Sequence, residues 1–132
     1  MYRLVYMSSA THVFKQEELE ELIEKSMANN TKIGITGLLI VKGKTFLQCL
    51  EGEKEEVIKL YEKIENDDRH YDVISLIEEN CDERLFPQWS MQYRNILNID
   101  LKEANGLKEF TTDSIKHLED SEVYDIFGYF ID

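Results

Sequence analysis

The sequence predicts an α+β fold in which five strands form a mixed sheet and two helices cover one of its faces. Three observations lead to this prediction. Short apolar runs rich in Val, Ile, Leu and aromatic residues alternate with two longer segments that carry apolar residues at helical spacing. The turn Lys42-Gly43-Lys44 joins the two middle runs as a hairpin. The 132 residues, 42% of them hydrophobic, suffice to bury a core without disulfides or metal.

The chain begins with a strand followed by an amphipathic helix. Strand alternation over Leu4 to Ser8 places Tyr6 on the same face as these two residues. The helix is expected over Gln16 to Asn29, because apolar and small residues recur there at i, i+3, i+4, i+7 and i+8. These residues are Leu19, Leu22, Ile23, Ser26 and Met27. The polar run Asn29-Asn30-Thr31 is expected to end the helix.

The two middle strands are expected at the centre of the sheet. Ile35 to Val41 is rich in Ile, Leu and Val with little alternation, which is typical of a strand buried on both faces. Thr45 to Gly52 follows the hairpin turn, and Gln48 lies in the middle of this otherwise apolar run. Alternation places Gln48 on the same face as Phe46 and Leu50.

A second helix and two further strands follow. The helix is expected over Glu53 to Asn66, with glutamates at the end that the helix dipole favours for negative charge. Its apolar face consists of Val57, Leu60, Tyr61 and Ile64. Val73 to Glu78 and Trp89 to Tyr93 are expected to be strands, separated by a polar loop. The order βαββαββ contains the split βαβ unit of ferredoxin-like folds.

The chain divides into a domain over residues 1–95 and a C-terminal helical segment over residues 96–132. Asp100 followed by Glu103 resembles a helix start with a capping-box glutamate. An apolar stripe at helical spacing then comprises Val123, Ile126, Phe127, Phe130 and Ile131. Because several strands are apolar on both faces, these helices are expected to cap the face of the sheet that the first two helices leave open.

Composition and charge exclude several classes of protein. Twenty-seven acidic against fifteen basic residues give a net charge of −12, which opposes nucleic-acid phosphates and anionic membranes. No apolar run approaches the roughly 20 residues that span a bilayer, and no signal-peptide pattern opens the chain. We therefore expect a soluble, cytoplasmic protein. Cys49 and Cys81 lack metal-ligand spacing and are expected to be buried free thiols.

The usual signatures of catalysis and phosphate binding are missing from the sequence. No Ser or Cys nucleophile stands out with a matching base, and the three histidines, His12, His70 and His117, are scattered. No G-x-G-x-x-G opens a helix after a strand, and there is no Walker loop. We expect a protein that is not an enzyme and holds no metal.

Several polar residues are nevertheless predicted to gather at one place. Gln48 on a core strand requires hydrogen-bond partners, and Tyr6 faces the same side of the sheet. Asn30 follows the first helix, and Asp67 and Arg69 follow the second. A planar ligand could insert between the two helices, with its polar edge meeting these side chains.

Each of these residues also has a purely structural interpretation. Tyr6 and Gln48 could satisfy each other's hydrogen bonds, and Asn30 could simply stop a helix. Asp67 to His70 could be a solvated turn. Trp89 and Met91, two apart on one strand, could pack the core. The spacing of the residues alone leaves both interpretations open.

Five sequence blocks resemble the BLUF family, blue-light sensors that bind flavin non-covalently. The resemblance covers about residues 1–93. The blocks are Tyr6-Met7-Ser8, Asn29 to Leu39, Phe46 to Gly52, Asp67 to His70, and Trp89-Ser90-Met91. Their order and spacing are those of the family, and the final 35 or so residues resemble its short, stand-alone members.

The resemblance implies a photoreceptor that holds FAD, with FMN or riboflavin as alternatives, between the two helices. Tyr6 would donate an electron and a proton, and Gln48 would be the amide that switches its hydrogen bonds. The implied flavin-binding residues are Tyr6, Ser8, Asn30, Lys32, Gln48, Lys63, Asp67, Arg69 and His70. Trp89 and Met91 would carry the signal to a downstream protein or to further copies of the chain. The competing hypotheses are a non-photoactive ferredoxin-like ligand-binding or interaction domain and, with least support, a flavin-dependent redox enzyme.

Overall fold

The computed structural model describes residues 1–85, 92–95 and 126. Its elements are β1 (Tyr2–Ala10), α1 (Gln16–Ile33), β2 (Thr36–Lys42), β3 (Thr45–Gly52), α2 (Lys54–Glu65), β4 (His70–Asn80) and β5 (Gln92–Asn95). The elements follow one another in the predicted order. β1 and β4 extend beyond their predicted ranges at both ends, and β2 starts and ends one residue later than expected.

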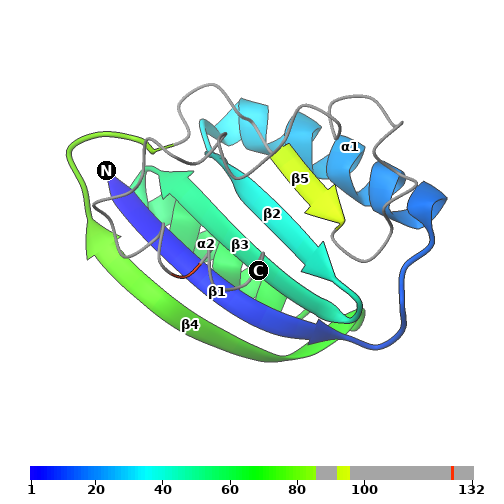
Figure 1. Cartoon of the computed structure of the whole chain (residues 1–132). Coiled ribbons are helices and arrows are strands. Elements are labelled where there is room, and N and C mark those ends of the chain that lie inside the picture. The colour runs from blue at the N-terminus through cyan, green and yellow to red at the C-terminus, as the bar shows by residue number, and fades with distance from the viewer. Residues whose placement is uncertain (86–91, 96–125, 127–132) are drawn as a thin grey trace.

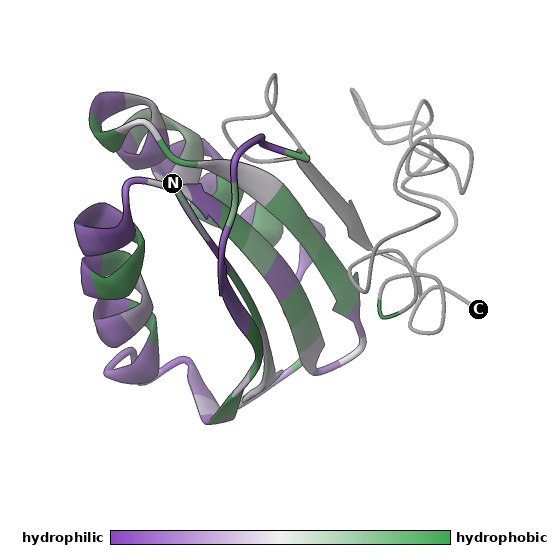
Figure 2. Ribbon diagram, turned by 90° about the vertical axis from the view of Figure 1, so that its left-hand side faces the viewer, coloured by the Kyte–Doolittle hydropathy of each residue, from purple (hydrophilic) through white to green (hydrophobic). Residues whose placement is uncertain are grey.

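One sheet contains the strands in the order β4-β1-β3-β2-β5, as Figure 1 shows. β1 pairs antiparallel with both β3 and β4, and β2 pairs antiparallel with β3, whereas β5 pairs parallel with β2. Both helices lie on the same side of the sheet in Figure 2. The predicted ferredoxin-like α+β class with a mixed sheet is therefore confirmed.

Two glycines allow β2 and β3 to form their hairpin. Gly43 has φ of +63° in the turn that brings Lys42 opposite Thr45, a conformation that glycine adopts without steric cost. Gly37 lies where the strands approach closely, because a Cβ atom added there would stand 1.8 Å from the carbonyl oxygen of Cys49. The hairpin thus depends on the absence of a side chain at Gly37.

The predicted end of the first helix is wrong. α1 continues through Asn29, Asn30 and Thr31 to Ile33, and Gly34 ends it with φ of +70°. The amide of Gly34 donates a hydrogen bond to the carbonyl of Asn30, which is the usual way a left-handed glycine closes a helix. Asn30 is therefore a buried residue of the last helical turn rather than the residue that stops the helix.

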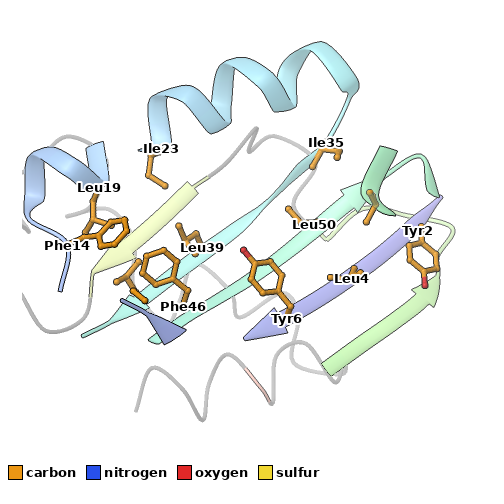
Figure 3. Packing of buried hydrophobic residues seen from close by; sticks show 13 residues of the cluster. Tyr2, Leu4, Tyr6, Phe14, Leu19, Ile23, Ile35, Leu39, Phe46 and Leu50 are labelled. Carbon is orange, nitrogen blue, oxygen red and sulfur yellow. The ribbon is translucent and has the colours of Figure 1, made fainter. Parts of the chain in front are cut away.

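The main core lies between the two helices and the sheet. It gathers the side chains that strand alternation places on the helix side, together with the inward faces of the helices (Figure 3). Its buried members include Leu4, Tyr6, Phe14, Leu19, Ile23, Leu39, Phe46, Leu50 and Val57. Met27, which the helical pattern placed on the inward face, is exposed.

The opposite face of the sheet is also buried at its centre. Val5 of β1, Leu38 and Ile40 of β2, and Leu47 and Cys49 of β3 are at most 1% exposed. Burial on both faces agrees with the nearly continuous apolar sequence of the middle strands. Cys49 is a buried free thiol as predicted, whereas Cys81 is only partly buried.

Some predictions lie outside the described residues. These are the positions of Trp89 and Met91, the helical segment assigned to residues 96–132, and the joint at residues 95–100, apart from Asn95 in β5 and Ile126. In the described part of the chain, no helix is both long and apolar enough to cross a membrane.

Candidate functional site

A cavity of about 260 Å³ lies between the inner faces of α1 and α2 on the helix side of the sheet. Its apolar lining comes from Phe14, Leu22, Leu39, Phe46, Leu60 and Ile64. Its polar lining comes from Tyr6, Lys25, Ser26, Asn29, Asn30, Gln48, Lys63, Asp67, Arg69 and His70. Apolar walls with a few polar groups are the usual composition of a small-molecule site.

Tyr6 and Gln48 form a hydrogen-bonded pair within this lining. They stand directly opposite each other in the β1–β3 ladder and are 2% and 8% exposed. The Tyr6 hydroxyl donates to Oε1 of Gln48. The structural interpretation, in which the two residues satisfy each other, and the functional one, in which both face a ligand, are thus both consistent with the geometry.

The surroundings of Tyr6 keep its phenol protonated. Burial raises its pKa well above the ordinary value, and the nearby Tyr61 and Asp67 add to the shift in the same direction. The Tyr6 ring lies 5.6 Å from the ring of Tyr61 on α2, between centroids. At neutral pH Tyr6 is therefore a hydrogen-bond donor held in a fixed orientation.

Asn30 reaches the cavity because α1 continues past it. The side chain lies on the last turn of the helix, 2% exposed, beside Asn29, which also lines the cavity. The sequence analysis selected Asn30 as a site residue, and the structure brings it to Tyr6 and Gln48, although its place in the helix was predicted wrongly.

Asp67, Arg69 and His70 follow α2 and contribute to the same lining. Arg69 Nε donates to Oδ1 of Asp67 at 2.9 Å, and the Arg69 amide donates to the same oxygen at 2.9 Å. These hydrogen bonds, the side-chain bond above all, hold the pKa of Asp67 at about 2 despite partial burial. The Asp67–Arg69 ion pair thus stabilises the turn. Both side chains line the cavity as charged groups at neutral pH.

Ser8, Lys32 and Lys63 are placed differently from one another. Ser8 is buried and bonds Nδ1 of His70 through its Oγ at 2.9 Å, so that it supports a lining residue. Lys63 of α2 lines the cavity. Lys32 is exposed and does not line it.

Several lining residues were not selected as site residues from the sequence, although Leu22 and Ser26 were assigned to the apolar helix face. Leu22, Lys25, Ser26 and Asn29 of α1 lie at helical spacing, so they form one stripe beside the core-facing stripe of Leu19 and Ile23. That spacing was the available signal, but it cannot separate a residue that packs on the sheet from one that faces a cavity. Phe14 precedes the helix and carried no periodic signal.

The comparisons with known proteins agree with this geometry. The family model described as BLUF, sensors of blue light using FAD, matches residues 1–92. A photoactivated adenylate cyclase subunit beta of Euglena longa is 34% identical over 89 residues, which are 67% of this chain and 10% of that protein. The chain thus spans about a tenth of the length of this curated relative.

Two solved structures are similar to the described fold. A bacterial light-regulated adenylyl cyclase is 36% identical with a TM-score of 0.71, covering 90% of this chain and 36% of that one. BlrB, a BLUF protein in its dark state, is 25% identical with a TM-score of 0.71, covering 95% of this chain and 88% of that one. The family match over most of the chain, together with a cavity that contains the hydrogen-bonded Tyr6 and Gln48, shows that this chain belongs to the BLUF family of blue-light sensors.

Proposed function

We propose that this chain is a blue-light photoreceptor that binds FAD non-covalently in the cavity and signals through a hydrogen-bond switch between Tyr6 and Gln48. The observation that carries the proposal is the buried Tyr6–Gln48 hydrogen bond in the lining of a ligand-sized cavity. Burying a phenol and an amide in a core costs free energy even when they hydrogen-bond to each other, and apolar residues would pack there without that cost. Their presence beside a cavity therefore supports a functional role.

The lining fits the two chemical sides of a flavin ring. The apolar side chains of Leu22, Leu39 and Ile64 suit the faces of a planar aromatic system, and the amides of Asn30 and Gln48 suit its carbonyl and ring-nitrogen edge. Asn30 would hold the carbonyl edge next to the switch, and the Asp67–Arg69 pair would offer an acceptor and donors to the imide edge.

The two lysines in the lining suit a phosphorylated cofactor. Lys25 on α1 and Lys63 on α2 are exposed and line the cavity from its two helices, in a protein whose net charge is −12. Their ammonium groups would attract the phosphates of FAD or FMN more than the uncharged chain of riboflavin. Lys32, which lies outside the lining, is assigned to the flavin by resemblance alone.

The switch follows from the chemistry of an amide. A bound flavin would supply the absorption of blue light and the capacity to accept an electron when excited. Tyr6 would give up an electron, and its proton would pass to the Gln48 amide to which the phenol is bonded. Rotation or tautomerisation of that amide exchanges donor for acceptor, so Gln48 would present a different hydrogen-bonding group to the cavity.

The signal would leave through another protein or through further copies of the chain, because we propose a sensor rather than an enzyme. The similar photoactivated and light-regulated adenylate cyclases are much longer proteins in which light regulates cyclase activity. Trp89 and Met91 remain the proposed output residues, and the proposed setting is the cytoplasm.

The test is an absorption spectrum of the purified protein before and just after blue illumination. We expect a flavin spectrum that shifts reversibly to longer wavelength. Gln48→Leu should retain the flavin and lose the shift, because leucine fills a similar volume without any hydrogen-bonding group. A normal shift in this variant would contradict the role of Gln48, and a wild-type protein that cannot be loaded with flavin would favour the non-photoactive ligand-binding or interaction domain.

A further inference from the structure

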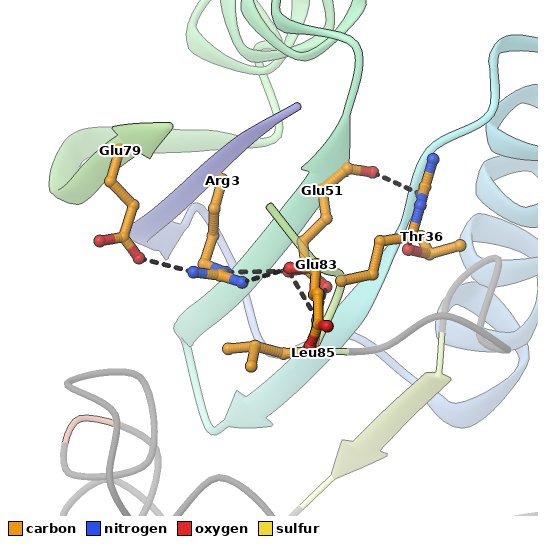
Figure 4. Close-up of polar contacts among 7 residues, drawn as sticks. Arg3, Thr36, Glu51, Glu79, Glu83 and Leu85 are labelled. Carbon is orange, nitrogen blue, oxygen red and sulfur yellow. Dashed lines mark hydrogen bonds and ion pairs between the residues drawn. The ribbon is translucent and has the colours of Figure 1, made fainter. Parts of the chain in front are cut away.

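The face of the sheet opposite the cavity holds a cluster of charged groups, here called the Glu51 cluster and comprising Arg3, Glu51, Glu79, Arg84 and the amide of Leu85. Glu51 is fully buried and Arg3 is 8% exposed. Figure 4 shows Arg3 between the two carboxylates. Its Nε donates to Oε2 of Glu51 at 2.8 Å, and its Nη1 donates to Oε1 of Glu79 at 2.7 Å.

The Glu51 cluster fastens the segment Glu83–Leu85 to the sheet. The Leu85 amide donates to both carboxylate oxygens of Glu51 at 2.9 Å, and Arg3 Nη2 donates to the carbonyl of Glu83 at 2.9 Å. Arg84 donates to the Glu51 carbonyl at 3.0 Å and, through Nη2, to the carbonyl of Gly34 at 2.7 Å. One short segment is thereby attached to β1, to β3 and to the end of α1.

The charged groups of the Glu51 cluster lie among buried apolar side chains. The neighbouring residues on this face, such as Val5, Leu47 and Cys49, are buried and uncharged. A fully buried ion pair is rarely the most stable choice for such a position, because the loss of hydration offsets much of the attraction. What the pair adds is a defined geometry, since removing Arg3 would take the cation away from the buried Glu51 carboxylate, whereas Arg3 also contacts Glu79.

The β1–β3 ladder connects this cluster directly to the cavity. Tyr6 stands opposite Gln48, and Arg3 stands opposite Glu51, three residue pairs further along the same two strands. The first pair points to the cavity and the second to the opposite face. Because paired strands share one register and separation, a displacement of β3 against β1 at Gln48 also changes the geometry of the Arg3–Glu51 pair.

We propose that Glu51 is a positioning residue that couples the Tyr6–Gln48 pair on the cavity face to the segment Glu83–Leu85 on the opposite face, and so to the chain that leads into β5. The coupling to light rests on the proposed function. When the Gln48 amide exchanges its hydrogen bonds, β3 moves relative to β1, and the two bonds from Leu85 to the Glu51 carboxylate weaken.

The test in light follows the hydrogen exchange of the single Leu85 amide by NMR, in the dark and under blue illumination. Loss of a charge-assisted hydrogen bond corresponds to roughly tenfold faster exchange, and we expect that change on illumination. Glu51→Gln should raise the dark rate and remove most of the light response while leaving the flavin red shift intact. The matched control is Glu79→Gln, which removes the other carboxylate on Arg3 without touching Leu85.

Two results in light would overturn the coupling. One is a Leu85 exchange rate that does not respond to light in a protein that shows the red shift. The other is a Glu51→Gln variant with the full response. If Glu51→Gln fails to fold, Arg84→Lys replaces it. Lysine keeps the positive charge but cannot donate to the carbonyls of Gly34 and Glu51 at the same time.

A second experiment tests the coupling without light. A failure of the proposed function can therefore be distinguished from a failure of the coupling. If no red shift exists, a double-mutant cycle between Tyr6→Phe and Glu51→Gln is measured by denaturant unfolding in the dark. We expect the change in the unfolding equilibrium constant of the double variant to differ by more than about twofold from the product of the changes in the two single variants. In the control cycle, with Glu79→Gln in place of Glu51→Gln, the two changes should simply multiply. Multiplicative behaviour in both cycles would overturn the coupling.

Discussion

At the scale of single residues, the site depends on one hydrogen bond whose donor and acceptor are both buried. Tyr6 donates to Gln48, and its raised pKa keeps the proton on the phenol. This bond satisfies the Tyr6 donor and the Gln48 carbonyl oxygen, which lowers the cost of burying two polar side chains in an apolar core. The same bond makes the pair sensitive to substitution, because the loss of either group removes it.

Tyr6→Phe separates the two roles of the phenol. Phenylalanine keeps the ring and its packing but removes the donor, so the protein should lose about 1–3 kcal/mol in the free energy of unfolding and still bind flavin. The normal photochemistry should be lost, as measured by transient absorption. Tyr61→Phe is the control, because its ring lies 5.6 Å from Tyr6 without taking part in the bond to Gln48. An unchanged photocycle in Tyr6→Phe would contradict its role as donor.

Asp67 gives the site a dependence on acid. Its pKa is lowered from 3.8 to about 2 by Arg69, so its contribution to stability is fully present above about pH 4 and is lost as the pH falls towards 2. Asp67→Asn should therefore melt at a lower temperature than the wild type at neutral pH, with the difference closing across this window. Thermal melts at several pH values measure it, and Asp68→Asn in the same turn is the control. A difference in melting temperature that is undiminished at pH 2 would contradict the assignment.

At the scale of elements, the kinds and order of helices and strands and the bounds of β3 could be predicted from the sequence, whereas several other ends and the register between strands could not. The first helix shows why. Asn29-Asn30-Thr31 is a plausible stop, but asparagine also tolerates a helical turn, and the decisive residue is Gly34, four positions beyond Asn30, with φ of +70°. The prediction placed Asn30 just after the helix, whereas the structure places it in a buried last turn beside the cavity.

Gly37 and Gly34 form a matched pair for testing the β2–β3 hairpin and the α1 end. Gly37→Ala should destabilise the protein by the upper part of the roughly 1–3 kcal/mol typical of overpacking, because its Cβ would collide with the Cys49 carbonyl. Gly34→Ala should cost about 1–2 kcal/mol. The added Cβ atom would have no neighbour within 4 Å, but the backbone at this position is left-handed. Urea denaturation measures both. Equal or reversed costs would show that β2 and β3 separate more easily than their register implies.

At the scale of the whole molecule, the sequence could place Tyr6 and Gln48 on core strands but could not show that they stand opposite each other. That fact depends on the β1–β3 register, which joins residues 42 positions apart. The same register brings Arg3 and Glu51 together. No local sequence pattern predicts this pair, because each charged residue alone is typical of the exposed face of a strand. The site and the cluster behind it are therefore products of strand pairing.

The last prediction concerns how a change in the cavity reaches a partner. If Trp89 belongs to the output rather than to the flavin site, Trp89→Ala should keep the flavin and its red shift but change the rate of dark recovery severalfold. The reason is that the segment Glu83–Leu85 is hydrogen-bonded to β1 and β3, and under the coupling proposed above recovery requires that segment to return. Tyr71→Ala, which removes an exposed aromatic side chain from β4, is the control and should recover at the wild-type rate.

Recovery is followed as the return of the dark absorption spectrum after illumination ends. Loss of bound flavin in Trp89→Ala would assign Trp89 to packing of the core, and output would then have to leave the sheet elsewhere. Retained flavin with altered recovery would instead connect the cavity, the β1–β3 ladder and the chain entering β5 into one path. Because both variants remove an aromatic ring, only a difference between them reports on that path.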